Sequence, residues 1–157
     1  MTSPPDIDDD RDSRAGAYYD RDDDIVLRHG RAATPAEQGA IASLVKQYYA
    51  AAASANGAAG CHLVYSLFAE AIAEDYGEGP GPLHGMTCTE VLSKMFKLKQ
   101  RQWAKELPAV KVVGARIEGK LGWAVINLGP KQAPRRIRIR LDGETWKIRQ
   151  LETLIMP

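Results

Sequence analysis

The sequence predicts an α+β fold in which three helices are followed by a four-stranded antiparallel meander. Apolar residues recur at helical spacing between residues 34 and 107, and from residue 110 onward they alternate with a period of two. The alternation is plainest over residues 135–148, where isoleucines and a leucine alternate with arginines. Within that stretch, Asp142-Gly143 supplies the positive φ angles of a tight hairpin turn.

The first 33 residues differ in composition from the rest of the chain. They are rich in Asp, Arg, Ser, Gly and Pro, and their few apolar residues bury too little surface to offset the entropy of ordering them. We therefore predict a disordered acidic tail over residues 1–33 and one domain over residues 34–157. The alternative is a docking segment anchored by Tyr18-Tyr19 or by Ile25-Val26-Leu27.

Two helices are predicted in the first half of the domain. Thr34-Pro35-Ala36-Glu37 provides a cap, a proline at the first helical position and the acid that closes a capping box. Ser54-Ala55-Asn56-Gly57 ends this first helix. The second helix is predicted from about residue 58 to residue 76, and the Gly- and Pro-rich residues 77–82 then form a loop.

A second capping box, Thr87-Cys88-Thr89-Glu90, begins the third predicted helix, which reaches about Leu107. One side of this helix offers apolar residues for burial, whereas its other side is basic. The basic side consists of Lys94, Lys97, Lys99, Arg101 and Lys105.

Four strands are predicted after residue 110. Glu118-Gly119-Lys120 turns the chain between the first two, Gly129-Pro130 ends the second, and residues 135–148 provide the last hairpin, which continues to Ile155. The predicted inner faces are Val113, Ala115 and Ile117 on the first strand, and either Trp123, Val125 and Asn127 or Ala124, Ile126 and Leu128 on the second.

Charge is distributed unevenly along the chain, although the formal net charge is only +1. Residues 1–31 hold nine Asp and five Arg, whereas residues 94–157 hold fifteen Lys and Arg against five acidic residues. Such a split indicates either an anionic partner for the basic half or an acidic tail that neutralises its own domain.

The chain shows no segment typical of membrane insertion or secretion. It lacks an apolar run of about 18 residues and the layout of a signal peptide. We therefore expect a cytoplasmic protein without a membrane span. The two cysteines, Cys61 and Cys88, are open to two interpretations, which are buried thiols or a single disulfide between two helix starts. A disulfide would favour an extracytoplasmic location.

The order of elements and two motifs resemble the nuclear transport factor 2-like superfamily. The motifs are Asp142-Gly143-Glu144-Thr145-Trp146-Lys147-Ile148 and Leu44-Val45-Lys46-Gln47-Tyr48-Tyr49-Ala50, the second of which is similar to that superfamily's first helix. The resemblance covers about residues 34–152. It implies three helices packed in the concave face of a curved sheet, and a homodimer formed through that sheet. The superfamily usually has a short strand between its second and third helices, and the Gly- and Pro-rich residues 77–86 depart from that pattern.

The similarity is greatest to small actinobacterial members of this superfamily, whose function is unassigned. These members carry one cysteine at the start of the second helix and another at the start of the third. Cys61 and Cys88 match those two positions. The resemblance therefore implies a disulfide between them.

Enzymes of this superfamily, of the ketosteroid isomerase type, place a tyrosine and two acids in an apolar cavity. By this resemblance Tyr48 matches the oxyanion tyrosine and Asp75 matches the general base. The second acid, which lies on a strand, is missing, because Asn127 is the polar residue available there. We therefore expect a non-catalytic binding or interaction module, and the alternative is a small-molecule isomerase or hydratase.

Five aromatic residues are candidates for a pocket that binds an apolar small molecule, and the alternative is that they fill the core. We expect neither a metal site nor a cofactor, because His62 and His84 have no second ligand at a recognisable spacing. The candidate pocket residues are Tyr48, Tyr65, Trp103, Trp123 and Trp146.

Arginines form the outer side of the predicted C-terminal hairpin. The first interpretation is a solvated surface, and the second is a homodimer interface or a contact with the acidic tail. Nucleic acid is not expected as a partner, because neither interleaved exposed aromatics nor a recognition motif accompanies the row. The basic face consists of Arg136, Arg138, Arg140 and Arg149, together with Lys147.

Overall fold

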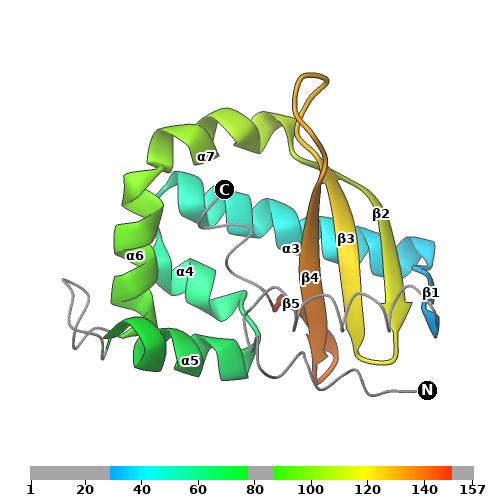
Figure 1. The fold of residues 1–157 in the computed structure, drawn as a ribbon, viewed down its shortest axis with the longest axis horizontal. Helices are drawn as coiled ribbons and strands as arrows, with labels where there is room; N and C mark the ends of the chain where they lie inside the picture. Colours follow the sequence, from blue (N-terminus) through cyan, green and yellow to red (C-terminus); the bar gives the residue numbers. More distant parts are fainter. Residues whose placement is uncertain (1–28, 78–86, 150–157) are drawn as a thin grey trace, which may run out of the picture.

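The computed structural model of the chain has an α+β fold, as the sequence predicts (Figure 1). It describes residues 29–77 and 87–149. The predicted tail up to residue 28, the loop after residue 77 and the continuation of the last strand lie outside these ranges. The five strands described form one antiparallel sheet in the order β1-β2-β3-β4-β5. Their bounds are β1 Arg31–Ala32, β2 Lys111–Glu118, β3 Leu121–Asn127, β4 Arg135–Asp142 and β5 Thr145–Ile148.

Strand β1 has no signal in the sequence, because a strand of two residues shows no periodicity. Its Arg31 lies opposite Ile117 of β2. Arg31 also forms an ion pair with Glu37, with 2.7 Å between Nη1 and Oε1. Hydrogen bonds from Arg31 and from the backbone of Thr34 lower the pKa of Glu37 to about 2. This pair ties the edge strand to the helix that follows.

Helix α3, Pro35–Ala53, begins with the predicted capping box. Thr34 Oγ1 accepts a hydrogen bond from Glu37 N, and Glu37 Oε1 accepts one from Thr34 N at 2.9 Å. The helix runs along one face of the sheet (Figure 1). Its apolar stripe is removed from water there, which is the main source of its stability. The buried residues are Ile41, Leu44, Val45, Tyr48, Tyr49, Ala51 and Ala52.

The predicted second helix is wrong as a continuous element. The chain forms α4, Gly57–His62, and α5, Ser66–Gly77, with a link between them. In the link, Leu63 O accepts a hydrogen bond from Ile148 N at 2.9 Å, and Tyr65 N donates one to Ile148 O at 2.8 Å. The helix is interrupted because these backbone groups bond to the edge of β5 instead of to each other.

The predicted third helix is also divided, into α6, Cys88–Leu98, and α7, Gln100–Glu106, and the short 3₁₀ helix η1, Leu107–Ala109, follows. The break falls at Lys99, whose φ and ψ are −126° and 27°. Gln100 Nε2 donates a hydrogen bond to Ala53 O at 3.0 Å, which anchors the corner to the end of α3. The bend lets Trp103 of α7 pack back on α3, with its ring 5.0 Å from that of Tyr49.

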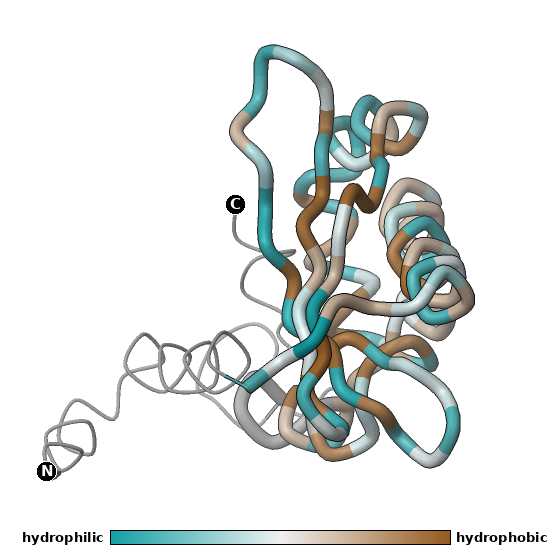
Figure 2. Tube along the Cα trace, turned by 90° about the vertical axis from the view of Figure 1, so that its right-hand side faces the viewer, coloured by the Kyte–Doolittle hydropathy of each residue, from teal (hydrophilic) through white to brown (hydrophobic). Residues whose placement is uncertain are grey.

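The sheet buries the face that meets α3, and hydropathy alternates along its strands (Figure 2). Of the two possible faces of β3, the second is correct, since Ala124, Ile126 and Leu128 are buried. On β2 the predicted inward position of Val113 is wrong. A bulge between Val112 and Gly114 shifts the register there, so Val113 is 51% exposed and Val112 is buried. On the C-terminal hairpin, Ile137, Ile139, Trp146 and Ile148 are buried on the face that meets α3, and Leu141 is partly buried there.

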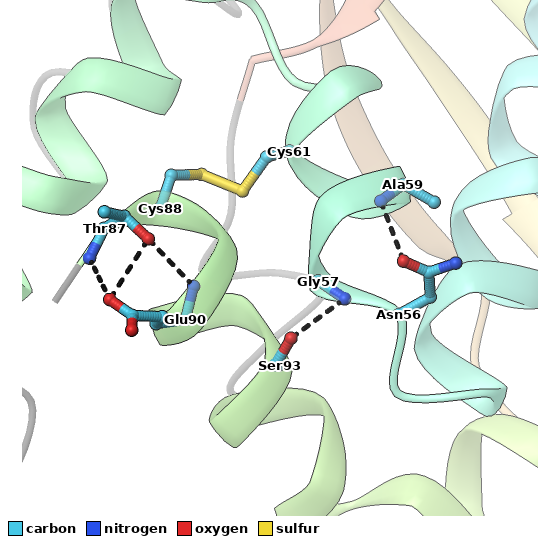
Figure 3. The surroundings of a disulfide bond; sticks show 8 residues. All are labelled: Asn56, Gly57, Ala59, Cys61, Thr87, Cys88, Glu90 and Ser93. Atoms are coloured by element: carbon cyan, nitrogen blue, oxygen red, sulfur yellow. Dashed lines mark hydrogen bonds between the residues drawn. A yellow bond between two sulfur atoms is a disulfide. The ribbon is translucent and has the colours of Figure 1, made fainter.

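Helices α4, α5 and α6 stack beside the sheet, past its β5 edge (Figure 1). Glycine allows α4 to approach α6 closely, because a Cβ at Gly60 would lie 2.7 Å from the Phe96 ring. Gly57 N donates a hydrogen bond to Ser93 Oγ at 3.1 Å. A disulfide joins Cys61 to Cys88 across the same contact, with Cα atoms 6.2 Å apart (Figure 3).

Removing this disulfide should lower the free energy of unfolding by about 3–4 kcal/mol, because the bond restricts a loop of 27 residues in the unfolded chain. Urea unfolding of the Cys61→Ser/Cys88→Ser variant measures the loss. Reductant should produce the same loss in the unmodified protein and no loss in the variant. Identical intact masses with and without reductant would mean that the thiols are free and that no bond forms.

Candidate functional site

A row of side chains crosses the outer face of the sheet. Arg116 of β2 lies opposite Trp123 of β3, which lies opposite Arg138 of β4. Arg149 follows β5 and donates its backbone N–H to Arg138 O at 2.8 Å. These four side chains share the face turned away from α3, because the residues between them are buried on the inner face.

Aromatic rings support the arginines on both sides of this row. The guanidinium of Arg136 lies 5.0 Å from the centre of the Trp123 ring, and that of Arg140 lies 5.1 Å from the centre of the Tyr65 ring. Arg138 and Arg149 are buried, with exposed fractions of 9% and 8%. The interpretation of this face as a solvated surface is therefore wrong for these two arginines.

The cations of α6 and α7 have a different environment. They are all exposed, and the ion pairs found within residues 29–77 and 87–149 do not include them. Leu98, at the corner where the two helices meet, is 82% exposed. A shallow open groove of about 560 Å³ follows residues 97–102. We call this surface the basic corner, and it consists of Lys94, Lys97, Leu98, Lys99, Arg101 and Lys105.

The five predicted pocket aromatics lie in three separate places. Tyr48 and Trp103 belong to a core cluster of edge-to-face rings with Tyr49 and Phe96. Tyr65 and Trp123 lie with the arginines of the outer face. Trp146 borders a groove of about 260 Å³ between α3 and β5. The structure therefore does not bring the five rings together.

The two adjacent tyrosines of the core have opposite environments. Tyr48 is fully buried and its hydroxyl has no hydrogen-bond partner, so burial strongly raises its pKa. Tyr49 Oη accepts a hydrogen bond from Arg135 Nη1 at 3.1 Å. Burial raises the pKa of Tyr49 to about 12, and the positive charge of Arg135 opposes the rise.

Arg135 belongs to a polar network around the buried Glu106, which the sequence interpretation missed. Its Nη2 lies 3.1 Å from Oε2 of Glu106, a carboxylate with 3% side-chain exposure, and Gln102 Nε2 donates to the same oxygen. The alternation along β4 could have predicted this position. Arg135 lies two residues before the buried Ile137, so both side chains point to the inner face. The pair neutralises both charges and joins α7 to β4.

The residues matched to an isomerase do not form a described constellation. Asp75 lies in α5, and its side chain is outside the part of the chain that the structure describes. Asn127 is exposed at the end of β3, where its Oδ1 accepts a hydrogen bond from Gly129 N at 3.2 Å. Of the two members whose side chains the structure describes, Tyr48 lies in an apolar, enclosed environment and Asn127 does not.

Neither a metal cluster nor a membrane span is found in the described part of the chain. His62 is exposed in the last turn of α4, where its backbone carbonyl accepts a hydrogen bond from Lys147 Nζ, and His84 is outside the described residues. Within residues 29–77 and 87–149, the side chains of His, Cys, Asp and Glu form no group of three that could hold a metal ion. No described helix is both long and apolar enough to cross a bilayer.

Comparison with known proteins identifies no relative. The chain matches no family model, no curated protein and no solved structure. The resemblance to the nuclear transport factor 2-like superfamily therefore stays a prediction.

Substitution of the two tyrosines should have opposite effects on stability. Tyr48→Phe removes a buried hydroxyl that lacks a partner, so we expect the free energy of unfolding to rise by about 1 kcal/mol. Tyr49→Phe leaves the hydrogen-bond donor of Arg135 without its acceptor, so we expect a loss of about 1–2 kcal/mol. Chemical unfolding of both variants checks this, and a loss in Tyr48→Phe as large as in Tyr49→Phe would show that the Tyr48 hydroxyl is bonded.

Proposed function

We propose that this domain is a non-catalytic binding module that attaches reversibly to an anionic lipid surface through the basic corner. The observation that carries the proposal is the exposed leucine at the meeting point of α6 and α7, in a segment whose five cations are exposed and form no ion pair with a described acid. The cations attract lipid headgroups, and the leucine side chain enters the boundary between headgroups and acyl chains.

The expected strength is that of a weak peripheral contact. Each cation near an anionic bilayer contributes about 1 kcal/mol at moderate ionic strength. Burial of a leucine side chain adds about 2 kcal/mol. Five cations and Leu98 therefore support reversible attachment of the order given by a single acyl chain. The hydrogen bond from Gln100 to Ala53 fixes the backbone of the basic corner before it meets a partner. Binding through the corner therefore requires little ordering of the backbone.

The chemistry of the corner favours lipid over nucleic acid. Single-stranded nucleic acid is bound by aromatic platforms interleaved with cations. The one aromatic residue of α7, Trp103, is buried against α3. Leu98 offers an apolar tip instead, which suits an acyl boundary and not a base.

The family resemblance adds finer expectations that remain part of the proposal. They are a cone in which the helices occupy the concave face of the sheet, a homodimer through the sheet, an apolar ligand in the cone and, given the Cys61–Cys88 disulfide, an extracytoplasmic location. A two-fold contact through the sheet would bring the arginines of two copies together. Because like charges repel, such a dimer requires anions between the two sheets.

The alternative function, a small-molecule isomerase or hydratase, draws on a single observation, the enclosed hydroxyl of Tyr48. It is the weaker candidate, because no acid is hydrogen-bonded to that hydroxyl.

Vesicle co-sedimentation tests the lipid contact. The protein should bind phosphatidylcholine vesicles containing about a third phosphatidylglycerol and should not bind pure phosphatidylcholine. Lys97→Gln/Lys99→Gln/Arg101→Gln should weaken binding about a hundredfold, since three cations leave the contact. Leu98→Ser should weaken it about thirtyfold and make the remainder fully sensitive to salt.

A matched control removes three exposed cations elsewhere, by Lys111→Gln/Lys120→Gln/Lys131→Gln. This variant has the same net charge as the corner variant and should retain most of the binding. Equal losses in the two variants would show that only net charge matters and would overturn the proposal. So would equal binding to the two kinds of vesicle, or binding to an RNA oligonucleotide that is abolished by the corner variant while vesicles are not bound.

A further inference from the structure

A groove between α3 and the first residues of β2 shares no residue with the basic corner. We infer that this groove binds a straight-chain aliphatic acid in its carboxylate form, of about the size of octanoate. The inference is independent of the lipid contact, because it concerns different residues and a different ligand. We call the site the lysine groove, and it is lined by Ala42, Val45, Lys46, Val110, Lys111 and Val112.

The walls of the lysine groove are apolar and already in place. Val45 of α3 and the two valines at the start of β2 are buried side chains. Ala42 faces them with a single methyl group, which leaves space between the helix and the strand. The bulge after Val112 keeps that residue buried and turns Val113 to solvent. Because these contacts belong to the packed fold, binding requires little ordering of the protein.

The size of the lysine groove limits the ligand to a short chain. Its volume is about 230 Å³. That volume equals the space of on the order of eight water-sized groups, and a methylene group is of similar size. Pockets for drug-sized ligands are larger than this. A single aliphatic chain of about six to eight carbons therefore suits the groove.

Two cations border the same groove without an acid to balance them. Lys46 and Lys111 are both exposed. Within residues 29–77 and 87–149, neither lysine forms an ion pair or a side-chain hydrogen bond. Two ammonium groups beside one groove repel each other, and an anion between them replaces that repulsion with attraction. The ligand that fits both the walls and the charges has an apolar chain and an anionic head.

The identity of the cations favours a carboxylate head over a phosphate head. Proteins commonly recognise phosphate through the planar fork of arginine. The lysine groove has no arginine among its lining residues, and its two ammonium groups act as compact point charges. A fatty acid and a lipid phosphate share an anionic head on an aliphatic chain, so the experiment compares these two sources.

Titration of the full chain with octanoate at pH 7, followed by NMR chemical shifts, tests the inference. The amide signals of Lys46 and Lys111 and the methyl signals of Ala42 and Val112 should shift and saturate, with a Kd of about 1 mM. Hexanoate should bind about tenfold more weakly, because two methylene groups leave the contact. Octanol should also bind about tenfold more weakly, because it has no charge.

The charge dependence has a matched control within the chain. Lys46→Gln/Lys111→Gln should weaken octanoate binding about tenfold. Lys120→Gln/Lys131→Gln removes the same charge at two other exposed positions and should leave the Kd unchanged. Thermal unfolding of both variants should show an unchanged fold, because all four side chains are exposed.

Two further variants separate this site from the rest of the molecule. Ala42→Leu fills the lysine groove and should abolish the saturable shifts. The corner variant, Lys97→Gln/Lys99→Gln/Arg101→Gln, should bind octanoate as tightly as the unmodified protein. Loss of vesicle binding in that variant with octanoate binding retained distinguishes the two sites.

Four results would overturn the inference. The first is a set of shifts that grow with octanoate concentration without saturating, which indicates non-specific association. The second is binding of octanol as tight as that of octanoate, and the third is an equal loss in the two lysine variants, which leaves only net charge. The fourth is tighter binding of octyl phosphate than of octanoate, which assigns the groove to a phosphate head.

Discussion

The close approach of α4 to α6 is the constraint on which the helical half of the molecule depends. Gly57 and Gly60 remove the side chains that would hold the two helices apart, and the Cys61–Cys88 bond keeps them together. With α6 held in this position, its bend at Lys99 sends α7 back across the end of α3. The direction of α7 in turn brings Trp103 into the core and Glu106 to Arg135.

Two sets of cations in this molecule differ in what surrounds them. On the basic corner the side chains extend into solvent, so they keep their hydration and can exchange it for a charged partner at little cost. On the outer face of the sheet, Arg138 and Arg149 are buried, whereas Arg136 is exposed and its guanidinium lies against the Trp123 ring. Burial, and not charge alone, distinguishes the two sets of cations.

Local signals in the sequence were sufficient for the fold class, the two capping boxes, the α3 stripe and the inner face of β4. They were not sufficient where contacts with distant segments of the chain determine the local backbone structure. The interruption at Leu63 depends on β5, which lies more than eighty residues away in the chain. The bulge at Val113 and the two-residue strand β1 likewise have no periodic pattern. Each of these differences arises because backbone groups bond across the sheet and override helical or strand propensity.

The candidate sites were predictable to a similar extent. The alternation of apolar and charged residues along β4 predicts that Arg136, Arg138 and Arg140 lie on the outer face. The same alternation predicts that Arg135 points inward. Its partner Glu106 could be identified only from the packing of α7. The aromatic residues were the least predictable, because Tyr48 and Trp123 have the same apolar character but lie on opposite sides of the sheet. A ring can fill a core or support a guanidinium, and composition does not distinguish these roles.

The link between α4 and α5 also affects how this sheet meets other chains. An uncovered edge strand presents free N–H and C=O groups that template the addition of further strands. Along β5, Leu63 and Tyr65 already occupy the outward backbone groups of Ile148. At the other edge, β1 offers a template of only two residues. The interrupted helix therefore protects the sheet against fibrillar growth, a protection that a continuous helix over the same residues would not give.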